Sequence, residues 1–76
     1  MNLADLKIGE TGIVKQVLEV GCQPGIVQRL TAMGIVSERP VQVLRKAIFN
    51  GPLHIRVGAT TEIAIRLQEA EMIIIK

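Results

Sequence analysis

Hydrophobic and polar residues alternate along two segments in the second half of the chain. In residues 53–57 the apolar side chains stand at every second position and enclose His54 and Arg56, and in residues 62–67 they stand at positions 63, 65 and 67. Alternation with a period of two is typical of β-strands that bury one face. Both segments are therefore predicted to be strands, with their charged residues on the outer face.

Three further apolar segments predict three more strands. Residues 40–46 and 72–75 are rich in β-branched and other large apolar side chains. Residues 11–20 alternate imperfectly, which predicts a bend or bulge near Val17-Leu18. Asn50-Gly51, between the second and third strands, is a strong turn signal. The chain is thus expected to form five short strands.

One helix is predicted between the first and second strands. Ile26, Leu30 and Met33 recur at the spacing i, i+4 and i+7, which is the apolar stripe of an amphipathic helix, and Pro24 suits its first turn. A helix of about three turns is marginal in isolation. Packing against the sheet is therefore expected to hold it.

The end of this helix carries an informative local signal. Gly34 is expected to take the left-handed conformation just past the helix, which lets Ile35 fold back onto Leu30 as in a Schellman stop. Residues 68–71, ahead of the last strand, are predicted to form a single helical turn.

Together these elements predict a fold that is mainly β. We expect a small SH3-like barrel of five strands, with one short α-helix inserted between strands one and two. The 76 residues, of which 49% are hydrophobic, suffice for a single domain over residues 1–76. Leu3 and Leu6 are expected to tuck inward against its core.

Composition removes several classes of function. Phe49 is the one aromatic residue, so the chain lacks the aromatic platforms that stack single-stranded nucleic acid and the aromatic groove that binds proline-rich peptides. A net charge of +2 with scattered positive residues does not indicate nucleic-acid binding. No glycine-rich phosphate motif is present, so the chain itself is not expected to bind GTP.

Cysteine content and hydropathy bear on the compartment. Cys22 is the single cysteine, which excludes an internal disulfide and favours a reducing compartment. No apolar run approaches the roughly 20 residues that span a bilayer, and the first residues lack the pattern of a signal peptide. A cytoplasmic protein with no direct membrane insertion is expected.

Short pieces spread over nearly the whole chain form an ordered pattern. They are Ile8-Gly9, Arg29-Leu30, Gly34-Ile35, Val41 with Val43–Ala47, Pro52-Leu53 with Ile55, and the closing segment Ile63–Ile75 with Arg66, Ala70 and Ile73. In order and spacing they resemble the FeoA family, the small cytosolic companions of the FeoB ferrous-iron transporter. The resemblance implies an SH3-like fold, with a structural signature at Leu30, Gly34, Ile35 and Ala70.

The same resemblance implies a function. FeoA-like proteins are thought to contact the transporter's cytosolic region, which carries a G-protein domain, so a non-enzymatic accessory role in ferrous-iron uptake is the leading hypothesis. The barrel also resembles the C-terminal domain of iron-dependent repressors of the diphtheria-toxin-regulator type. The alternatives are a free-standing interaction domain of that metal-repressor type, which would bind another protein or form a homo-oligomer, and a small-barrel nucleic-acid binder.

Two turns depart from the family pattern. Ser37-Glu38 stands where the family usually has Pro-Gly, so the glycine that would supply a left-handed turn after the helix is missing. Asn50-Gly51-Pro52 replaces the usual Gly-Asp-Pro, which keeps a turn and loses the carboxylate. No role of that Asp is therefore carried over to this chain.

Catalysis and metal binding find little support in the residue set. Cys22 and His54 can form a nucleophile–base pair only if the fold brings them together. A transition-metal site needs three or four protein ligands, and the carboxylates are scattered along the chain. His54 and Cys22 are the metal candidates, and no cofactor is expected unless iron or another transition metal binds at a site shared between two copies. Otherwise His54 is a polar residue on an outer strand face.

Partner binding is the remaining function, and basic residues mark one candidate surface for it. They lie at the end of strand two, on the outer faces of strands three and four, and on the outer side of the helix: Arg45, Lys46, His54, Arg56, Arg66 and Arg29. If the strands pair, the residues on the sheet form one positive patch. The alternative is an ordinary solvated face with Glu62 and Glu69 nearby.

A second candidate surface is apolar. The predicted loops contain the large apolar residues Ile35, Val36, Ile48 and Phe49. Exposed apolar residues in loops mark partner or dimer surfaces. The alternative is structural, with Ile35 capping the helix and Ile48-Phe49 folding over an open end of the barrel.

Overall fold

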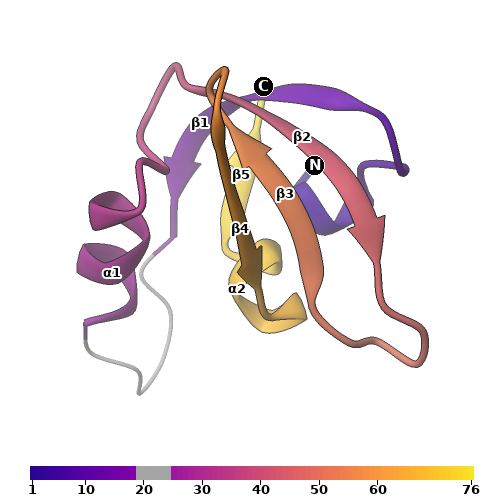
Figure 1. The fold of residues 1–76 in the computed structure, drawn as a ribbon. Helices are drawn as coiled ribbons and strands as arrows, with labels where there is room; N and C mark the ends of the chain where they lie inside the picture. The colour runs from indigo at the N-terminus through magenta and orange to yellow at the C-terminus, as the bar shows by residue number, and fades with distance from the viewer. Residues whose placement is uncertain (19–24) are drawn as a thin grey trace.

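Five antiparallel strands form one curled sheet in the computed structural model of the chain, which describes residues 1–18 and 25–76. Their order across the sheet is β4-β3-β2-β1-β5 (Figure 1). The strands are β1 (Thr11–Val17), β2 (Pro40–Lys46), β3 (Leu53–Val57), β4 (Thr61–Ile65) and β5 (Ile73–Ile75). The helices are the 3-10 turn η1 (Leu3–Asp5), α1 (Ile26–Ala32) and α2 (Leu67–Glu71).

Most of the predicted elements are confirmed, and the differences lie at their ends. β2 and β3 have the predicted bounds. β1 ends at Val17, before the predicted end at Val20, which lies outside the described residues. β4 ends at Ile65 because the chain turns there into α2, so the predicted strand through Leu67 is wrong at its last two residues. The fold is mainly β, as predicted, and the helical turn predicted over residues 68–71 is the short helix α2.

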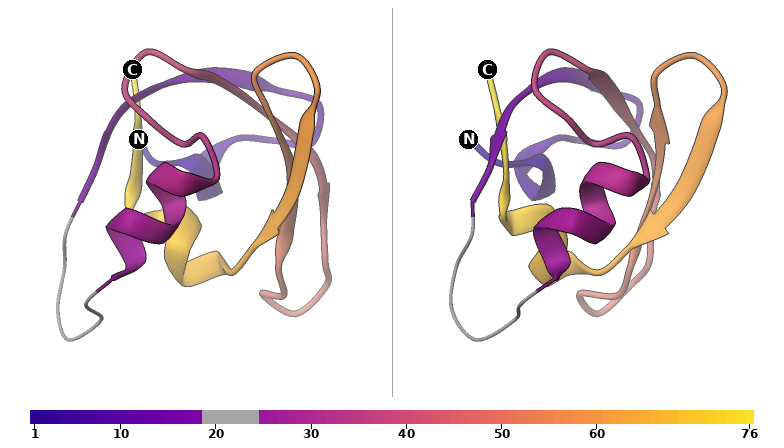
Figure 2. Two further views of the ribbon diagram at one scale, coloured as in Figure 1. Left: turned by 60° about the vertical axis from the view of Figure 1, so that its left-hand side comes forward. Right: turned by 90° about the vertical axis from the view of Figure 1, so that its left-hand side faces the viewer.

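The core lies inside the curl of the sheet, and α1 and α2 lie side by side at its open side (Figure 2). Leu3 and Leu6 are buried, as predicted. α1 contributes the buried Leu30 and α2 the buried Ala70. Every strand supplies buried apolar side chains to the same cluster: Val14, Val41, Val43, Leu53, Ile55, Val57, Ile65, Ile73 and Ile75.

Helix α1 ends at the predicted Schellman stop. Gly34 has a φ of 93°, and its N–H donates to the Thr31 carbonyl at 3.0 Å. The Ile35 N–H donates to the Leu30 carbonyl at 3.0 Å. These are the two hydrogen bonds of the motif, and they leave Leu30 and Ile35 both fully buried. The predicted start at Pro24 lies outside the described residues, and α1 begins at Ile26 after Gly25.

The turn after this stop keeps a left-handed residue even though glycine is absent from it. Glu38 has a φ of 72°. Its N–H donates to the Val14 carbonyl at 2.8 Å, and the next N–H along the chain, of Arg39, donates to the Val36 carbonyl at 3.1 Å. The carboxylate of Glu38 also pairs with the Lys76 ammonium. The turn is therefore formed without glycine, and Glu38 takes the strained left-handed conformation instead.

The first and last residues of the chain lie together on the sheet. Asn2 forms an isolated antiparallel bridge with Ile74, and the Ile75 N–H donates to the Met1 carbonyl at 2.9 Å.

None of the helices in residues 1–18 and 25–76 combines the length and the apolar character needed to cross a bilayer.

Replacing Gly34 by alanine is expected to destabilise the fold by about 1–2 kcal/mol, because alanine is strained in the left-handed conformation. A Cβ there would lie 3.5 Å from Val57 Cγ1, which is an ordinary contact, so the cost is conformational rather than steric. In urea denaturation the free energy of unfolding should be highest for the parent, lower for Gly34→Asn and lowest for Gly34→Ala. Asn ranks above Ala because it tolerates the left-handed conformation better. Equal stability of Gly34→Ala and the parent would contradict this prediction.

Glu38→Gly is expected to have the opposite effect and to stabilise the fold by about 1 kcal/mol, because glycine relieves the left-handed strain. The melting temperature should rise by about 5 °C. Glu38→Ala is the matched control: it removes the same surface ion pair, worth at most about 1 kcal/mol, and keeps the strain. The prediction fails if the two variants melt at the same temperature.

Candidate functional site

The basic residues predicted on the sheet come together because β2, β3 and β4 are neighbours. His54 of β3 pairs across the sheet with Arg45 of β2 and with Ala64 of β4. Arg56 of β3 pairs with Glu62 of β4. Residues that are opposite each other in an antiparallel pair point to the same face, so all these side chains share the outer face of the sheet.

A bulge decides on which face Arg45 lies. The pairing of β2 with β3 shifts between Val43, opposite Ile55, and Arg45, opposite His54, so Leu44 is an extra residue on β2. Without this bulge Arg45 would fall on the same face as the buried Val43. A second bulge lies in β1 between Val14 and Gln16, and the bulge predicted near Val17-Leu18 is therefore misplaced.

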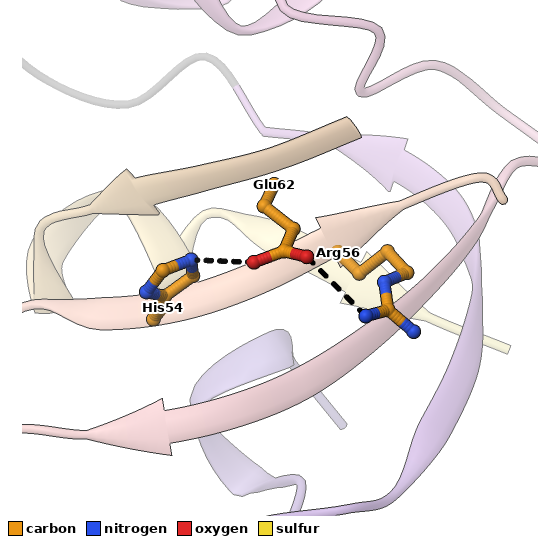
Figure 3. Close-up of polar contacts among 3 residues, drawn as sticks. All are labelled: His54, Arg56 and Glu62. Atoms are coloured by element: carbon orange, nitrogen blue, oxygen red, sulfur yellow. Dashed lines mark hydrogen bonds and ion pairs between the residues drawn. The ribbon is translucent and has the colours of Figure 1, made fainter. Parts of the chain in front are cut away.

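An acidic residue lies between two of the predicted basic ones. One carboxylate oxygen of Glu62, Oε1, lies 3.3 Å from His54 Nε2, and the other, Oε2, accepts a hydrogen bond from Arg56 Nη2 at 3.3 Å (Figure 3). All three side chains are about 40% exposed. Pairs of this kind contribute at most about 1 kcal/mol, so they orient the side chains more than they stabilise the fold. This part of the face carries both signs of charge.

The same geometry bears on the metal candidates. His54 and Glu62 are the two possible ligands that lie together here, and Glu62 also faces the Arg56 cation. No group of three or more His, Cys, Asp or Glu residues that could hold a metal ion occurs within residues 1–18 and 25–76. Cys22 lies outside these residues, so the structure does not place it relative to His54.

Two other predicted basic residues have structural contacts. Arg66 was predicted to project from β4, and this is wrong. The strand ends one residue earlier, at Ile65, and Arg66 is the N-cap residue of α2. Its N–H donates to Glu69 Oε1 at 2.8 Å, while its side chain is exposed. The Lys46 ammonium donates to the Ala4 carbonyl at 3.2 Å, which joins the end of β2 to η1.

Glu69 is a buried carboxylate, so it does not belong to the solvated face that was the alternative to a positive patch. It is only 4% exposed. Its second oxygen, Oε2, pairs with Nη2 of Arg29 on α1, whose side chain is 53% exposed. Arg29, predicted to contact a partner, thus connects the two helices. Glu69 caps the Arg66 N–H as the acid of a capping box does, but Arg66 is not one of the usual N-cap residues, so the sequence carried no signal for this role.

The β2–β3 hairpin turns at Ile48–Gly51. The Gly51 N–H donates to the Ile48 carbonyl at 3.3 Å, and the two central residues, Phe49 and Asn50, have φ values of 57° and 61°. Positive φ at both central positions is the pattern of a type I′ hairpin turn. A Cβ on Gly51 would lie 2.6 Å from the Ala47 Cβ, so this position requires glycine.

The apolar residues predicted in loops divide into two groups. Ile35 is buried beside the helix stop, and Val36 next to it is half-buried. Ile48 and Phe49 are 79% and 94% exposed, so they do not fold over an end of the sheet. Next to them is a shallow, largely apolar groove, lined by Arg45, Lys46, Ala47, Pro52, Leu53, His54 and Ala64. The hairpin therefore places an apolar projection beside an apolar hollow.

Comparisons with known proteins agree with this architecture. The sequence model of the FeoA domain matches residues 1–76. The structure of FeoA from Stenotrophomonas maltophilia complexed with zinc is 27% identical, with a TM-score of 0.86 over 100% of this chain and 89% of that chain. The FeoA protein from Chlorobium tepidum is 29% identical, with a TM-score of 0.84 over 99% of this chain and 68% of that chain.

The likeness extends to a different class of protein at the level of the fold. A manganese-dependent transcriptional repressor is 19% identical, with a TM-score of 0.82, and the match covers 96% of this chain and 39% of that chain. The S. maltophilia structure is described as an SH3 domain protein, so the predicted SH3-like fold is confirmed. No match to a curated protein was found.

Arg29→Ala is expected to destabilise the fold by about 1–3 kcal/mol, because it leaves the buried Glu69 carboxylate without its cation. In the Glu69→Gln background the same change should cost at least about 0.5 kcal/mol less. Urea denaturation of the four proteins of this cycle measures the coupling. Gln28→Ala, an exposed change on the same helix, is the control and should stay within about 0.5 kcal/mol of the parent. Absence of coupling between Arg29 and Glu69 would refute the assigned pair.

Proposed function

The chain belongs to the FeoA family, and from this membership we propose that it is a non-enzymatic accessory protein of ferrous-iron uptake. It acts in the cytoplasm by binding the cytosolic G-protein region of a FeoB-type transporter. The observation that carries this proposal is the family match over residues 1–76, the whole length of the chain.

The described relatives support an accessory role. The S. maltophilia protein was put forward as a bacterial ferrous iron transport activating factor. A further FeoA structure, 28% identical with a TM-score of 0.80, is described as an iron uptake regulatory protein. Both descriptions assign regulation of transport rather than a chemical reaction. The outer face of the sheet and the exposed hairpin tip give this chain polar and apolar surface with which to bind such a partner.

Binding to the transporter is tested by calorimetric titration of the folded protein with the purified cytosolic G-protein region, in GDP-bound and GTP-analogue-bound forms. We expect saturable binding that weakens as salt is raised, because exposed charges contribute to association. An unrelated small G protein is the control and should give no heat of binding. Lack of binding at low salt, with both partners shown to be folded, would refute the proposal. Self-association, or binding to a metal-dependent repressor chain instead, would favour the repressor-type alternative.

A further inference from the structure

Phe49, the one aromatic residue of the chain, lies almost wholly in water. It is 94% exposed, and its neighbour Ile48 is 79% exposed. Burying a side chain of this size in the core contributes about 1.5–3 kcal/mol of stability, which the fold forgoes at both positions. The loop that carries them projects from the end of the β2–β3 hairpin (Figure 1). A partner that covers the tip would gain this burial instead.

The turn does not require phenylalanine at this position. Phe49 and Asn50 both have positive φ, at 57° and 61°. Asn adopts this conformation readily, whereas a bulky residue is an outlier there. Such strain is concentrated at functional sites. Phe49 is thus both unburied and conformationally unfavourable, so neither packing nor turn geometry accounts for it.

The groove beside the tip limits what can cover it. Ala47 and Pro52, which flank the tip, also line the groove, together with Leu53 and Ala64. The apolar tip and the groove therefore adjoin each other on the surface. A bilayer surface could accept the two apolar side chains, but it offers no fixed side chain to fill the hollow. A folded protein surface can interlock with both.

Charge around the tip indicates the chemistry of that surface. Arg45 lies at the base of the tip, lines the groove and is exposed on the outer face beside His54. The ammonium of Lys46, in contrast, is held by the Ala4 carbonyl at 3.2 Å. Glu62, an acid on this face, is already engaged by His54 and Arg56. A second copy that docked here by the same surface would bring Arg45 toward its counterpart, and like charges oppose association. The charge thus favours an acidic partner over a second copy.

We propose that Ile48, Phe49 and the adjoining groove form the docking surface for a protein that presents an apolar pocket ringed by carboxylates. Phe49 enters that pocket, Arg45 faces the carboxylates, and an apolar side chain of the partner enters the groove. The inference rests on the proposed function, because it takes the partner to be the transporter's cytosolic region. Aromatic residues seated in desolvated pockets commonly dominate binding energy, which is the part assigned to Phe49.

The test is titration of the transporter's cytosolic region with four variants of the full chain. Phe49→Asn removes the ring and suits the turn, Ile48→Ser removes the second apolar side chain, and Arg45→Glu reverses the charge. Ile8→Ser is the matched control, because Ile8 is also apolar and 61% exposed but lies outside the hairpin. Melting curves establish that each variant is folded.

We expect Phe49→Asn to weaken binding by at least about 30-fold. Ile48→Ser should weaken it by about tenfold, since it removes less apolar area. Arg45→Glu should weaken binding at low salt and flatten its salt dependence, and Ile8→Ser should bind like the parent.

The outcomes separate this inference from the function on which it rests. If the parent binds and Phe49→Asn binds equally well, the docking surface is wrong and the proposed function stands. If the parent does not bind at all, the proposed function fails and the inference fails with it. If Arg45→Glu binds as well as the parent, the claim that the partner's surface is acidic is wrong. The choice of a protein partner is overturned if Phe49 is needed for another association and not for binding to the cytosolic region. That other association would be binding to vesicles of anionic phospholipid, or formation of a dimer seen by sedimentation.

Discussion

Reversal of the chain at the end of α1 is the constraint on which the rest of the structure depends. Two backbone hydrogen bonds close the helix at Gly34, and they bring Leu30 and Ile35, on either side of the reversal, into the same buried cluster. A helix of seven residues would not hold by itself, so these contacts fix it against the sheet. Once α1 is fixed, Arg29 reaches the buried Glu69 of α2 and ties the helices together. Local geometry at one glycine thus positions a long-range ion pair.

The sequence predicts the strands well wherever the pattern of a segment alone decides its structure. β3 alternates cleanly, and its bounds agree with the prediction. Prediction fails where the deciding contact comes from elsewhere. Leu67 continues the alternation of β4, yet the strand stops because Glu69 accepts the Arg66 N–H and opens a helix. The bulge at Leu44 has no local signal, since it exists only in the register of β2 against β3.

The candidate site follows the same division. Alternation alone places His54 and Arg56 on one face, but the position of Arg45 beside them depends on the bulge. Carboxylates and apolar side chains behave here against their usual preferences, since Glu69 is buried and Phe49 is exposed. A burial rule applied residue by residue cannot predict either case. The first becomes possible through a cation from another helix, and the second through a turn that directs its central side chains outward.

Contact between the two ends of the chain has a consequence for the way this fold is used. Met1 and Ile75 are hydrogen-bonded neighbours, so the polypeptide enters and leaves at one place, while the β2–β3 tip lies at the opposite end of the sheet (Figure 1). A unit with this layout can be fused to another polypeptide at a single junction without disturbing its core. The match to a manganese-dependent transcriptional repressor, which covers 39% of that chain, shows the same fold within a longer polypeptide. Fusion at that junction leaves the far end of the sheet exposed.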